Sequence, residues 1–468
     1  MVFDWSLATI GDFVDLQRGN TYQSKLLDTP GPVLLGLASI ERDGGFRDDK
    51  LRTYGGESPA KLLVYPGDIY VSLKDVTQAG DLLGSVARVP VSISVGRMTQ
   101  DTVKLIFKNE LIDRSYLYWV LRSPEYREYC RARGMGTTNL SLSRDDFLSF
   151  SVPEPTATRL LIQKSLDSIE ERISLNRCMN QILEAMAQAI FKSWFVDFDP
   201  VKAKIAAVEL GEDPLRAAMR VISGKTDAEL DEMPPEHHAQ LAATAALFPD
   251  ALEDSASGEI PRTWGVGTLG SVTSYLGRGT SPKYLDEGGV LVLNQKCIRN
   301  FRLDESKGRR HDPTQRAIDG RLLELGDVLV NSTGVGTLGR VAQVLCLNEP
   351  TIVDSHVTVV RTNSELNSSY IGQYFIWKHP DIEAMGEGST GQTELSRAKL
   401  SELLVLKPGA SVLKVFDRII FAFNDEISVS DCESRALAEM RNTLLQKLIP
   451  GELSVDALNE NADNSGAP

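Results

Sequence analysis

Two stretches of the sequence resemble nucleotide-binding motifs, and each lacks a required part. Residues 334–339 read Gly-Val-Gly-Thr-Leu-Gly, but the dinucleotide-binding fingerprint has to follow a strand and open a helix. Here residues 340–347 follow, and their pattern is that of a strand. Residues 223–226 read Ser-Gly-Lys-Thr, like the end of a phosphate-binding loop, yet Met219 stands where that loop needs its first glycine. We therefore expect turn glycines at the first stretch and no nucleoside triphosphate site at the second.

Acid–base and metal chemistry are also weakly indicated. Asp250 and Glu259 would suit a nuclease carboxylate pair only with a lysine two residues after the glutamate, where Pro261 stands. The sequence has no Asn-Pro-Pro-aromatic stretch, so the catalytic motif of amino-methyltransferases is missing. The histidines show no metal-ligand spacing: they are His237, His238, His311, His356 and His379. We predict no catalytic residue, no metal site and no cofactor on this chain.

Basic side chains that recur in two parts of the chain are the best candidates for binding. Lysine and arginine contact DNA phosphates, and arginine, asparagine and glutamine can read base edges in the major groove. Any single basic residue is more often a solvated surface charge, so the recurrence carries the argument. The candidate DNA-binding residues are Arg18, Lys25, Arg42, Lys74, Arg278, Lys283, Lys296, Arg299 and Arg309.

The distribution of charge permits such binding although the net charge is -14. Residues 1–150 carry 18 Lys/Arg against 19 Asp/Glu, and residues 264–408 carry 16 against 16. The acidic excess therefore lies elsewhere, in the parts expected to be helical or linking. No apolar run approaches the roughly 20 residues that cross a bilayer, and the N-terminus lacks a signal-peptide pattern. We expect a cytoplasmic protein whose five widely spaced cysteines are buried small hydrophobes.

The chain contains an internal repeat. Residues 5–11 match residues 264–270 at an offset of 259, and residues 66–69 match 325–328 at the same offset. Residues 83–87 match 338–342 at an offset of 255. Each copy begins with β-type runs, continues with a short helix near Ser115 or Ser369, and reaches a Gly/Thr-rich loop at 134–138 or 386–391. The sequence therefore predicts two copies of one mixed α/β domain.

A long amphipathic helix is expected after each domain. In the first, Ile162, Leu166, Ile169 and Ile173 recur at helical spacing, and after a slip at residues 174–175 the stripe resumes at Met179. Such a stripe could pack on its own domain or pair with its twin. A stripe near 35 residues runs roughly 50 Å, beyond a small domain, which favours an antiparallel pair. The candidate pairing or partner-binding residues are Ile169, Ile173, Met186, Trp194, Phe195, Ile427, Met440 and Leu448.

Three segments resemble parts of the specificity subunit of type I restriction-modification enzymes, and the resemblance extends over nearly the whole chain. Residues 185–200 resemble the end of that family's first conserved helix. Residues 248–250 with 258–264 resemble the entry into its second target-recognition domain, and residues 444–453 resemble the close of its second helix. Residues 205–245 are a departure from the pattern, and we assign them no role.

The resemblance implies an α+β fold with two similar target-recognition domains related by pseudo-twofold symmetry. The domains would be separated by two long helices that form an antiparallel coiled coil. The expected order is target-recognition domain 1 at 1–155, conserved helix 1 at 156–200, a linker with one or two short helices at 201–260, target-recognition domain 2 at 261–408, conserved helix 2 at 409–455 and a disordered tail at 456–468.

The resemblance also implies a non-catalytic subunit of a restriction and adenine-N6 methyltransferase complex. Each domain would read one half of a bipartite double-stranded DNA target, and the helices would fix the spacer and dock two modification subunits. Those subunits would hold S-adenosylmethionine, and restriction subunits would use ATP and Mg²⁺. The alternative is a scaffold that binds no DNA and docks two identical protein partners, and a self-contained adenine methyltransferase ranks third.

Overall fold

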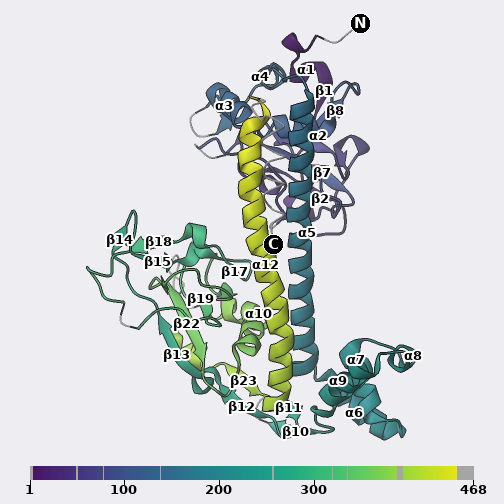
Figure 1. The fold of residues 1–468 in the computed structure, drawn as a ribbon, viewed down its shortest axis with the longest axis vertical. Coiled ribbons are helices and arrows are strands. Elements are labelled where there is room, and N and C mark those ends of the chain that lie inside the picture. The colour runs from purple at the N-terminus through teal and green to yellow at the C-terminus, as the bar shows by residue number, and fades with distance from the viewer. Residues whose placement is uncertain are drawn as a thin grey trace, which may run out of the picture. The chain divides into compact units, whose positions relative to one another are not determined.

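The computed structural model describes residues 4–48, 51–76, 79–136, 139–255, 258–318, 320–334, 336–386 and 394–450. The chain divides into two compact units, Met1–Leu175 with Glu433–Pro468, and Asn176–Cys432. Each unit contains one α/β domain and parts of both long helices, α5 (Ala157–Phe195) and α12 (Ala410–Leu448) (Figure 1). The expected tail at 456–468, residues 137–138 of the first Gly/Thr-rich loop and residues 387–391 of the second lie outside the described residues.

The first domain is built on a four-stranded antiparallel sheet in the order β1-β8-β4-β6. A smaller sheet, β2-β7-β3, pairs β2 and β7 in parallel. The strands are β1 (Val14–Arg18), β2 (Val33–Leu35), β3 (Leu63–Val64), β4 (Ile69–Ser72), β5 (Lys74–Asp75), β6 (Val86–Arg88), β7 (Gly96–Met98), β8 (Thr102–Phe107) and β9 (Leu140–Ser141). The α-helices are α1 (Ile10–Phe13), α2 (Arg114–Val120), α3 (Pro124–Arg133) and α4 (Arg144–Leu148).

The second domain repeats this topology with the sheet β13-β22-β19-β20, again antiparallel. Its other sheet, β14-β18-β15-β21, pairs β15 and β21 in parallel. The strands are β10 (Leu252–Ser255), β11 (Gly258–Pro261), β12 (Gly265–Thr268), β13 (Thr273–Arg278), β14 (Tyr284–Leu285), β15 (Val290–Leu293), β16 (Ile298–Arg299), β17 (Arg302–Leu303), β18 (Arg309–His311), β19 (Val328–Asn331), β20 (Val341–Gln343), β21 (Thr351–Val353), β22 (Val357–Thr362) and β23 (Leu404–Lys407). The helices are α10 (Ser368–Ala384) and α11 (Arg397–Ser401).

The repeat offsets found in the sequence recur between equivalent strands. Strands β4 and β19 begin 259 residues apart, and β8 and β22 begin 255 apart. A β-bulge between Thr273 and Tyr275 adds one residue to β13. The turn before β4 has Gly67 at φ +85°, and the turn before β19 has Gly326 at φ +91°, a region that favours glycine. The matching Gly-Asp pairs therefore mark the same turn in two copies of one domain.

In the first unit, the start of α5 runs antiparallel to the end of α12. The Arg159 guanidinium donates hydrogen bonds to the carbonyl oxygens of Leu448 and Ile449, at 3.3 and 2.6 Å. Arg172 donates to both carboxylate oxygens of Glu433, at 2.9 and 3.0 Å. Residue numbers therefore increase along α5 in the direction in which they decrease along α12, so the two helices are antiparallel here.

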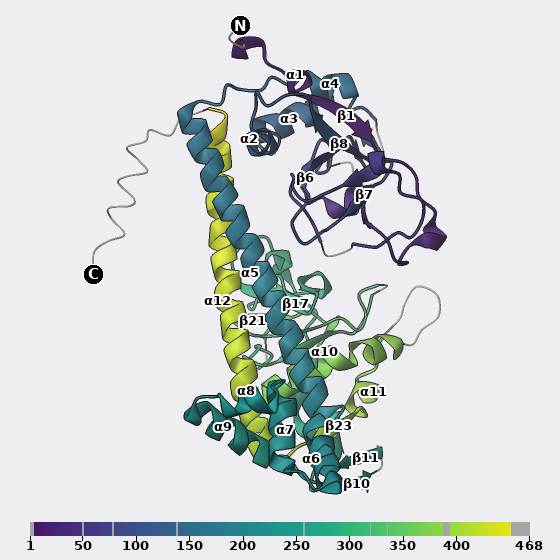
Figure 2. The same ribbon diagram turned by 90° about the vertical axis from the view of Figure 1, so that its right-hand side faces the viewer.

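The second unit shows the same antiparallel order. Asn180 donates to the Asp431 carboxylate at 2.7 Å, and the Trp194 and Phe195 rings lie 6.1 and 5.0 Å from the Phe416 ring. Figure 2 shows α5 and α12 alongside each other. The expected α+β class with long antiparallel helices is confirmed.

Residues 199–246 form four helices, where one or two short ones were expected. They are α6 (Asp199–Leu210), α7 (Pro214–Ser223), α8 (Asp227–Asp231) and α9 (Pro235–Ala246). Ala218, Met219, Leu230 and Ala245 form a small buried core of their own. The Ser-Gly-Lys-Thr stretch is the turn between α7 and α8: Gly224 caps α7 at φ +66°, and the side chain of Thr226 caps α8.

Other details bear on the sequence predictions. The described glycines of the Gly-x-Gly-x-x-Gly stretch, Gly334, Gly336 and Gly339, all have positive φ and lead into strand β20, so they are turn glycines. The expectation of buried cysteines is wrong for Cys178 and Cys432, which are exposed. Among the described helices, none is long and apolar enough to cross a membrane.

Candidate nucleic-acid interface

One end of the first domain's main sheet brings together two of the candidate basic residues. Arg18 is the last residue of β1, and its Nε donates to the carbonyl oxygen of Gln100 at 3.2 Å. Lys74 follows β4, and its Nζ lies 3.4 Å from a carboxylate oxygen of Asp101. The backbone just after β1 can lie close to residues 99–101 because residue 19 is a glycine: a Cβ there would lie 1.9 Å from the Thr99 carbonyl oxygen. Arg18 and Lys74 therefore both contact the turn that precedes β8.

The equivalent end of the second domain has the same backbone geometry. Arg278 is the last residue of β13, and its guanidinium contacts the Glu394 carboxylate at 2.7 Å. A Cβ on the next residue, Gly279, would lie 2.0 Å from the Val353 carbonyl oxygen. Arg18 and Arg278 thus occupy equivalent positions beside equivalent turns. These ends carry the loops that follow β4 and β19, and loops held on a rigid sheet are where binding residues concentrate.

The remaining candidates are spread over the two domains. Arg42 has 78% of its side chain exposed and pairs with Asp81 at 3.4 Å. The Arg309 guanidinium stacks 3.5 Å above the Tyr284 ring, and Lys283 precedes that tyrosine. Lys25, Lys283 and Lys296 are exposed, whereas Arg299 is half-buried. The structure thus gathers Arg18 with Lys74 and Lys283 with Arg309, and leaves the others at separate places in their domains.

One neighbouring basic residue, Arg302, stabilises the fold instead of facing solvent. Arg302, on the hairpin β16-β17, contacts Glu184 of α5 at 2.7 Å and Asp431 of α12 at 2.8 Å. Burial lowers the pKa of Arg302, but the two carboxylates outweigh it and raise the pKa above its usual value. Arg302 therefore anchors the second domain to both helices of its unit. The sequence gave no sign of this role, because Glu184 and Asp431 are distant from Arg302 along the chain.

The candidate residues of the helices fall into two groups. Ile169, Ile173 and Leu448 are 8%, 5% and 0% exposed in the first unit. In the second unit Trp194, Phe195 and Ile427 are also buried. Met186 and Met440, by contrast, are 45% and 56% exposed, so neither side chain is enclosed between the helices.

The exposed group on α5 includes more than Met186. Met179 and Ile182 are 43% and 50% exposed, and with Met186 they recur at spacings of three and four residues on one helix face. The buried face continues instead through Asn176 and Asn180, which are 4% and 1% exposed. Between residues 176 and 186, α5 therefore has a polar buried face and an apolar exposed one, whereas the buried side chains from Ala187 to Phe195 are apolar again.

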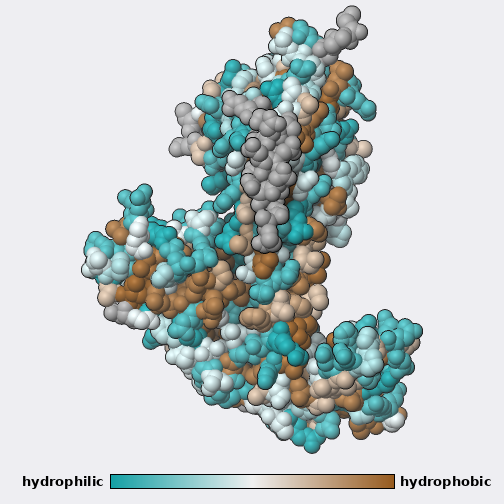
Figure 3. Space-filling model, viewed as in Figure 1, coloured by the Kyte–Doolittle hydropathy of each residue, from teal (hydrophilic) through white to brown (hydrophobic). Residues whose placement is uncertain are grey.

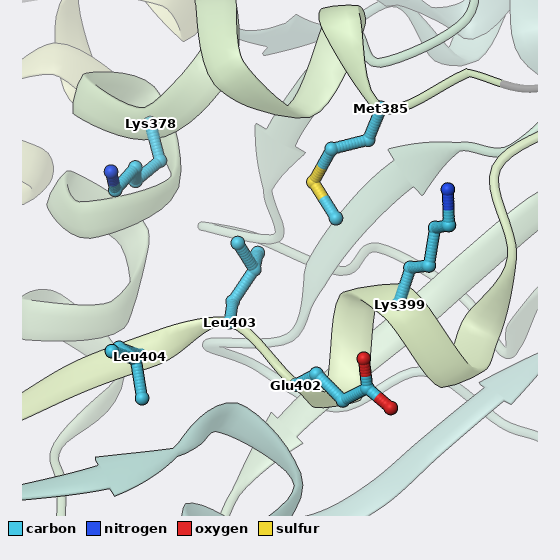
Figure 4. A pocket seen from close by; sticks show the side chains of 6 residues that line it. All are labelled: Lys378, Met385, Lys399, Glu402, Leu403 and Leu404. Atoms are coloured by element: carbon cyan, nitrogen blue, oxygen red, sulfur yellow. The ribbon is translucent and has the colours of Figure 1, made fainter.

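A surface depression lies elsewhere in the second domain. It has a volume of about 380 Å³ and is lined by residues of α10, α11 and β23 (Figure 4). Lys378, Lys399 and Glu402 line it together with Met385, Leu403 and Leu404. These six side chains include no nucleophile with a base beside it, so the depression does not resemble a catalytic centre. Among the described residues, no group of three or more His, Cys, Asp or Glu side chains is placed to hold a metal ion.

Apolar and polar side chains occupy different regions of the second domain's surface. Figure 3 shows hydrophobic side chains gathered over β15 and β19. Exposed apolar residues near these strands include Leu322, Leu325 and Leu345. An apolar face of this kind offers no phosphate contacts, which leaves the polar loops at the sheet end as the better candidate for DNA.

Comparison with known proteins identifies curated relatives of this chain. The HindI type I restriction enzyme specificity subunit of Haemophilus influenzae is 26% identical over 366 residues, covering 72% of this chain and 77% of that relative. This chain is a homologue of type I restriction enzyme specificity subunits. The MjaIX specificity subunit of Methanocaldococcus jannaschii is 20% identical over 468 residues, covering 97% of this chain and 95% of that protein. No protein-family model matches the chain.

A solved structure shares the fold of this specificity-subunit homologue. The type I restriction-modification system S subunit from M. genitalium aligns with 95% of this chain and 96% of its own, with a TM-score of 0.52 and 16% identity. The resemblance predicted from residues 185–200, from 248–250 with 258–264, and from 444–453 is confirmed. Two of these segments meet in the structure, where the Phe195 and Trp264 rings lie 5.9 Å apart and those of Trp194 and Phe248 lie 5.0 Å apart.

Proposed function

We propose that this chain is the DNA-reading specificity subunit of a type I restriction-modification complex. Each α/β domain reads one half of a bipartite double-stranded target. The chain itself is non-catalytic and carries no cofactor. Two modification subunits bring S-adenosylmethionine and methylate adenine N6, and restriction subunits bring ATP and Mg²⁺. The observation that carries the proposal is the duplicated domain in a homologue of specificity subunits.

Two features support DNA reading by both domains. The same sheet end recurs in each, with Arg18 in one and Arg278 in the other beside the same turn. The exposed cations Lys25, Lys283 and Lys296 can contact phosphates, which fix the register of a protein on DNA without reading its sequence. The base contacts are then left to other side chains at the loops.

The long helices fix the spacer and dock the partner subunits. Each helix has 39 residues, which corresponds to a length of about 58 Å. The apolar side chains of Met179, Ile182 and Met186 are about half exposed on one face of α5, and a face of this kind suits a protein partner. The pseudo-equivalent Met440 is exposed on α12, so each helix offers a methionine to one of two modification subunits.

Binding selection tests this function. The chain is co-expressed with the adenine methyltransferase subunit of its own system, and the complex selects duplexes from a randomised library. We expect a consensus of two short half-sites separated by unread base pairs, and an affinity that falls by orders of magnitude between low and physiological salt. A complex that forms but selects no sequence, with a flat salt response, would instead support the scaffold that binds no DNA.

A further inference from the structure

Equivalent residue pairs lie across the same two loops in both domains. Lys74 follows β4 and contacts Asp101, which precedes β8. Thr333 follows β19, and its Oγ1 lies 2.8 Å from Nδ1 of His356, which precedes β22. The offsets, 259 from Lys74 to Thr333 and 255 from Asp101 to His356, are those of the flanking strands β4/β19 and β8/β22. The two copies therefore keep the geometry of this contact while its chemistry differs.

Both pairs are open to solvent. The side chains of Lys74 and Asp101 are 47% and 27% exposed. His356 is exposed and Thr333 is half-buried. Two partly exposed side chains in mutual contact on loops at the end of a sheet can turn their remaining hydrogen-bonding groups to a ligand.

In the second domain a third polar side chain is held in place. The Gln295 amide donates from Nε2 to Thr333 Oγ1 at 2.5 Å. The carbonyl oxygen of Gln295 accepts from Asn331 Nδ2 at 3.1 Å, and Asn331 is fully buried at the end of β19. Gln295 is thus fixed through both its backbone and its side chain, and little rotamer entropy remains to be lost on binding.

The held amide has the groups needed to read adenine. Its Nε2 has a second hydrogen to donate, and its Oε1 can accept. A glutamine amide used in this way pairs with N7 and N6 of adenine in the major groove. In the first domain, Gly36 stands at the position of Gln295 by the offset of 259, so this amide is missing there.

The first domain offers different groups at the same place. A lysine ammonium donates to N7 and O6 of guanine, and a carboxylate accepts from N4 of cytosine. Lys74 and Asp101 together therefore match the major-groove edge of a G·C pair, whereas Gln295 with Thr333 and His356 matches adenine.

We infer that these equivalent loop pairs, Lys74–Asp101 and Thr333–His356 with Gln295, are specificity-determining positions that each read a base pair of one half-site. This inference rests on the proposed function, because it assigns residues to the reading of the two half-sites. It explains how copies of one domain recognise different sequences: the fold places two loop positions against the DNA, and the side chains there set the preferred base.

A transplant of one pair into the other domain tests the inference. The full chain with T333K and H356D is co-expressed with its modification subunit and used in the same binding selection. We expect one position of the second half-site to change its preference towards G·C by about tenfold or more, with the first half-site unchanged. The reciprocal chain, K74T with D101H, should alter one position of the first half-site alone.

A matched control lies at the opposite end of the second domain's sheet. Lys407 and Glu365 form a partly exposed ion pair there, and K407T with E365H replaces a lysine and a carboxylate by threonine and histidine, as K74T with D101H does, without touching the proposed reading positions. This control should select the wild-type sequence. Gln295→Ala provides a milder variant in case the transplant does not fold, and it should relax the adenine preference at one position of the second half-site.

The outcomes separate the inference from the function on which it rests. If wild type selects a bipartite site and the folded transplant and Gln295→Ala select the same site, the loop pairs do not read bases and the function stands. A transplant that changes the opposite half-site also overturns the inference. If wild type selects no sequence at all, the proposed function fails and the inference fails with it.

Discussion

The two apolar positions Ile173 and Met179 of α5 should respond very differently to truncation. Ile173 is 5% exposed and Met179 is 43% exposed, although both belong to the stripe seen in the sequence. Ile173→Ala removes three carbon groups, which corresponds to a transfer free energy of about 2.4 kcal/mol at 0.8 kcal/mol each. The better helix propensity of alanine returns about 0.4 kcal/mol. The expected loss is therefore about 2 kcal/mol for Ile173→Ala and within about 0.5 kcal/mol for Met179→Ala.

Hydrogen exchange followed by mass spectrometry measures the loss of local stability in the full chain. Global unfolding of a chain with two compact units need not be two-state, so the exchange rates of α5 amides are the better measure. A loss of about 2 kcal/mol corresponds to about thirtyfold faster exchange around residue 173. Equal effects of the two substitutions, or a larger effect at Met179, would refute the assignment of buried and exposed faces.

Three further substitutions or labels test other parts of the structure. Met186→Glu with Met440→Glu should leave the fold intact but weaken the complex with the modification subunit, as measured by size-exclusion chromatography; an unchanged complex would move the docking face elsewhere. Burial raises the pKa of Cys297 to about 11, so at pH 8 this thiol should resist alkylation in the native chain while the exposed Cys178 reacts. Burial also raises the pKa of Asp354 above its ordinary value of 3.8, so the cost of its charge to stability is absent below that pH and grows as the pH rises through the folded pKa. Asp354→Asn should therefore stabilise the second domain at pH 7, with a gain that disappears as the pH falls towards 3.8 in thermal melts; a gain independent of pH would contradict this.

The repeat made most of the fold predictable. The matched turns at Gly67 and Gly326 and the constant offsets indicated two copies of one domain before any strand was placed. Helical periodicity likewise revealed both long helices. It could not reveal which face of α5 is buried between residues 176 and 186, because Asn176 and Asn180 occupy the buried face there and the apolar residues of this stretch are exposed. Hydrophobic patterning assumes that apolar means buried, and this segment does not follow it.

Less of the candidate site than of the fold could be predicted from the sequence. Counting cations found Arg18 and Lys74, but it gave no sign that the nearby Arg302 binds Glu184 and Asp431 of the helices instead. It also passed over Gln295 and Thr333, because uncharged polar residues carry no signal until the fold sets them side by side. An arginine that anchors the fold can be distinguished from one that faces solvent only through contacts between residues that are far apart in the sequence.

The central claim is that each domain reads its half-site independently. The most direct measurement replaces the first domain of the chain with a second copy of its own second domain, and maps adenine methylation by the complex with its modification subunit. Because α5 and α12 run antiparallel, this account predicts methylation at an inverted repeat of the second half-site around a spacer of unchanged length. Methylation that stays at the original asymmetric target, in a complex that assembles normally, would contradict it.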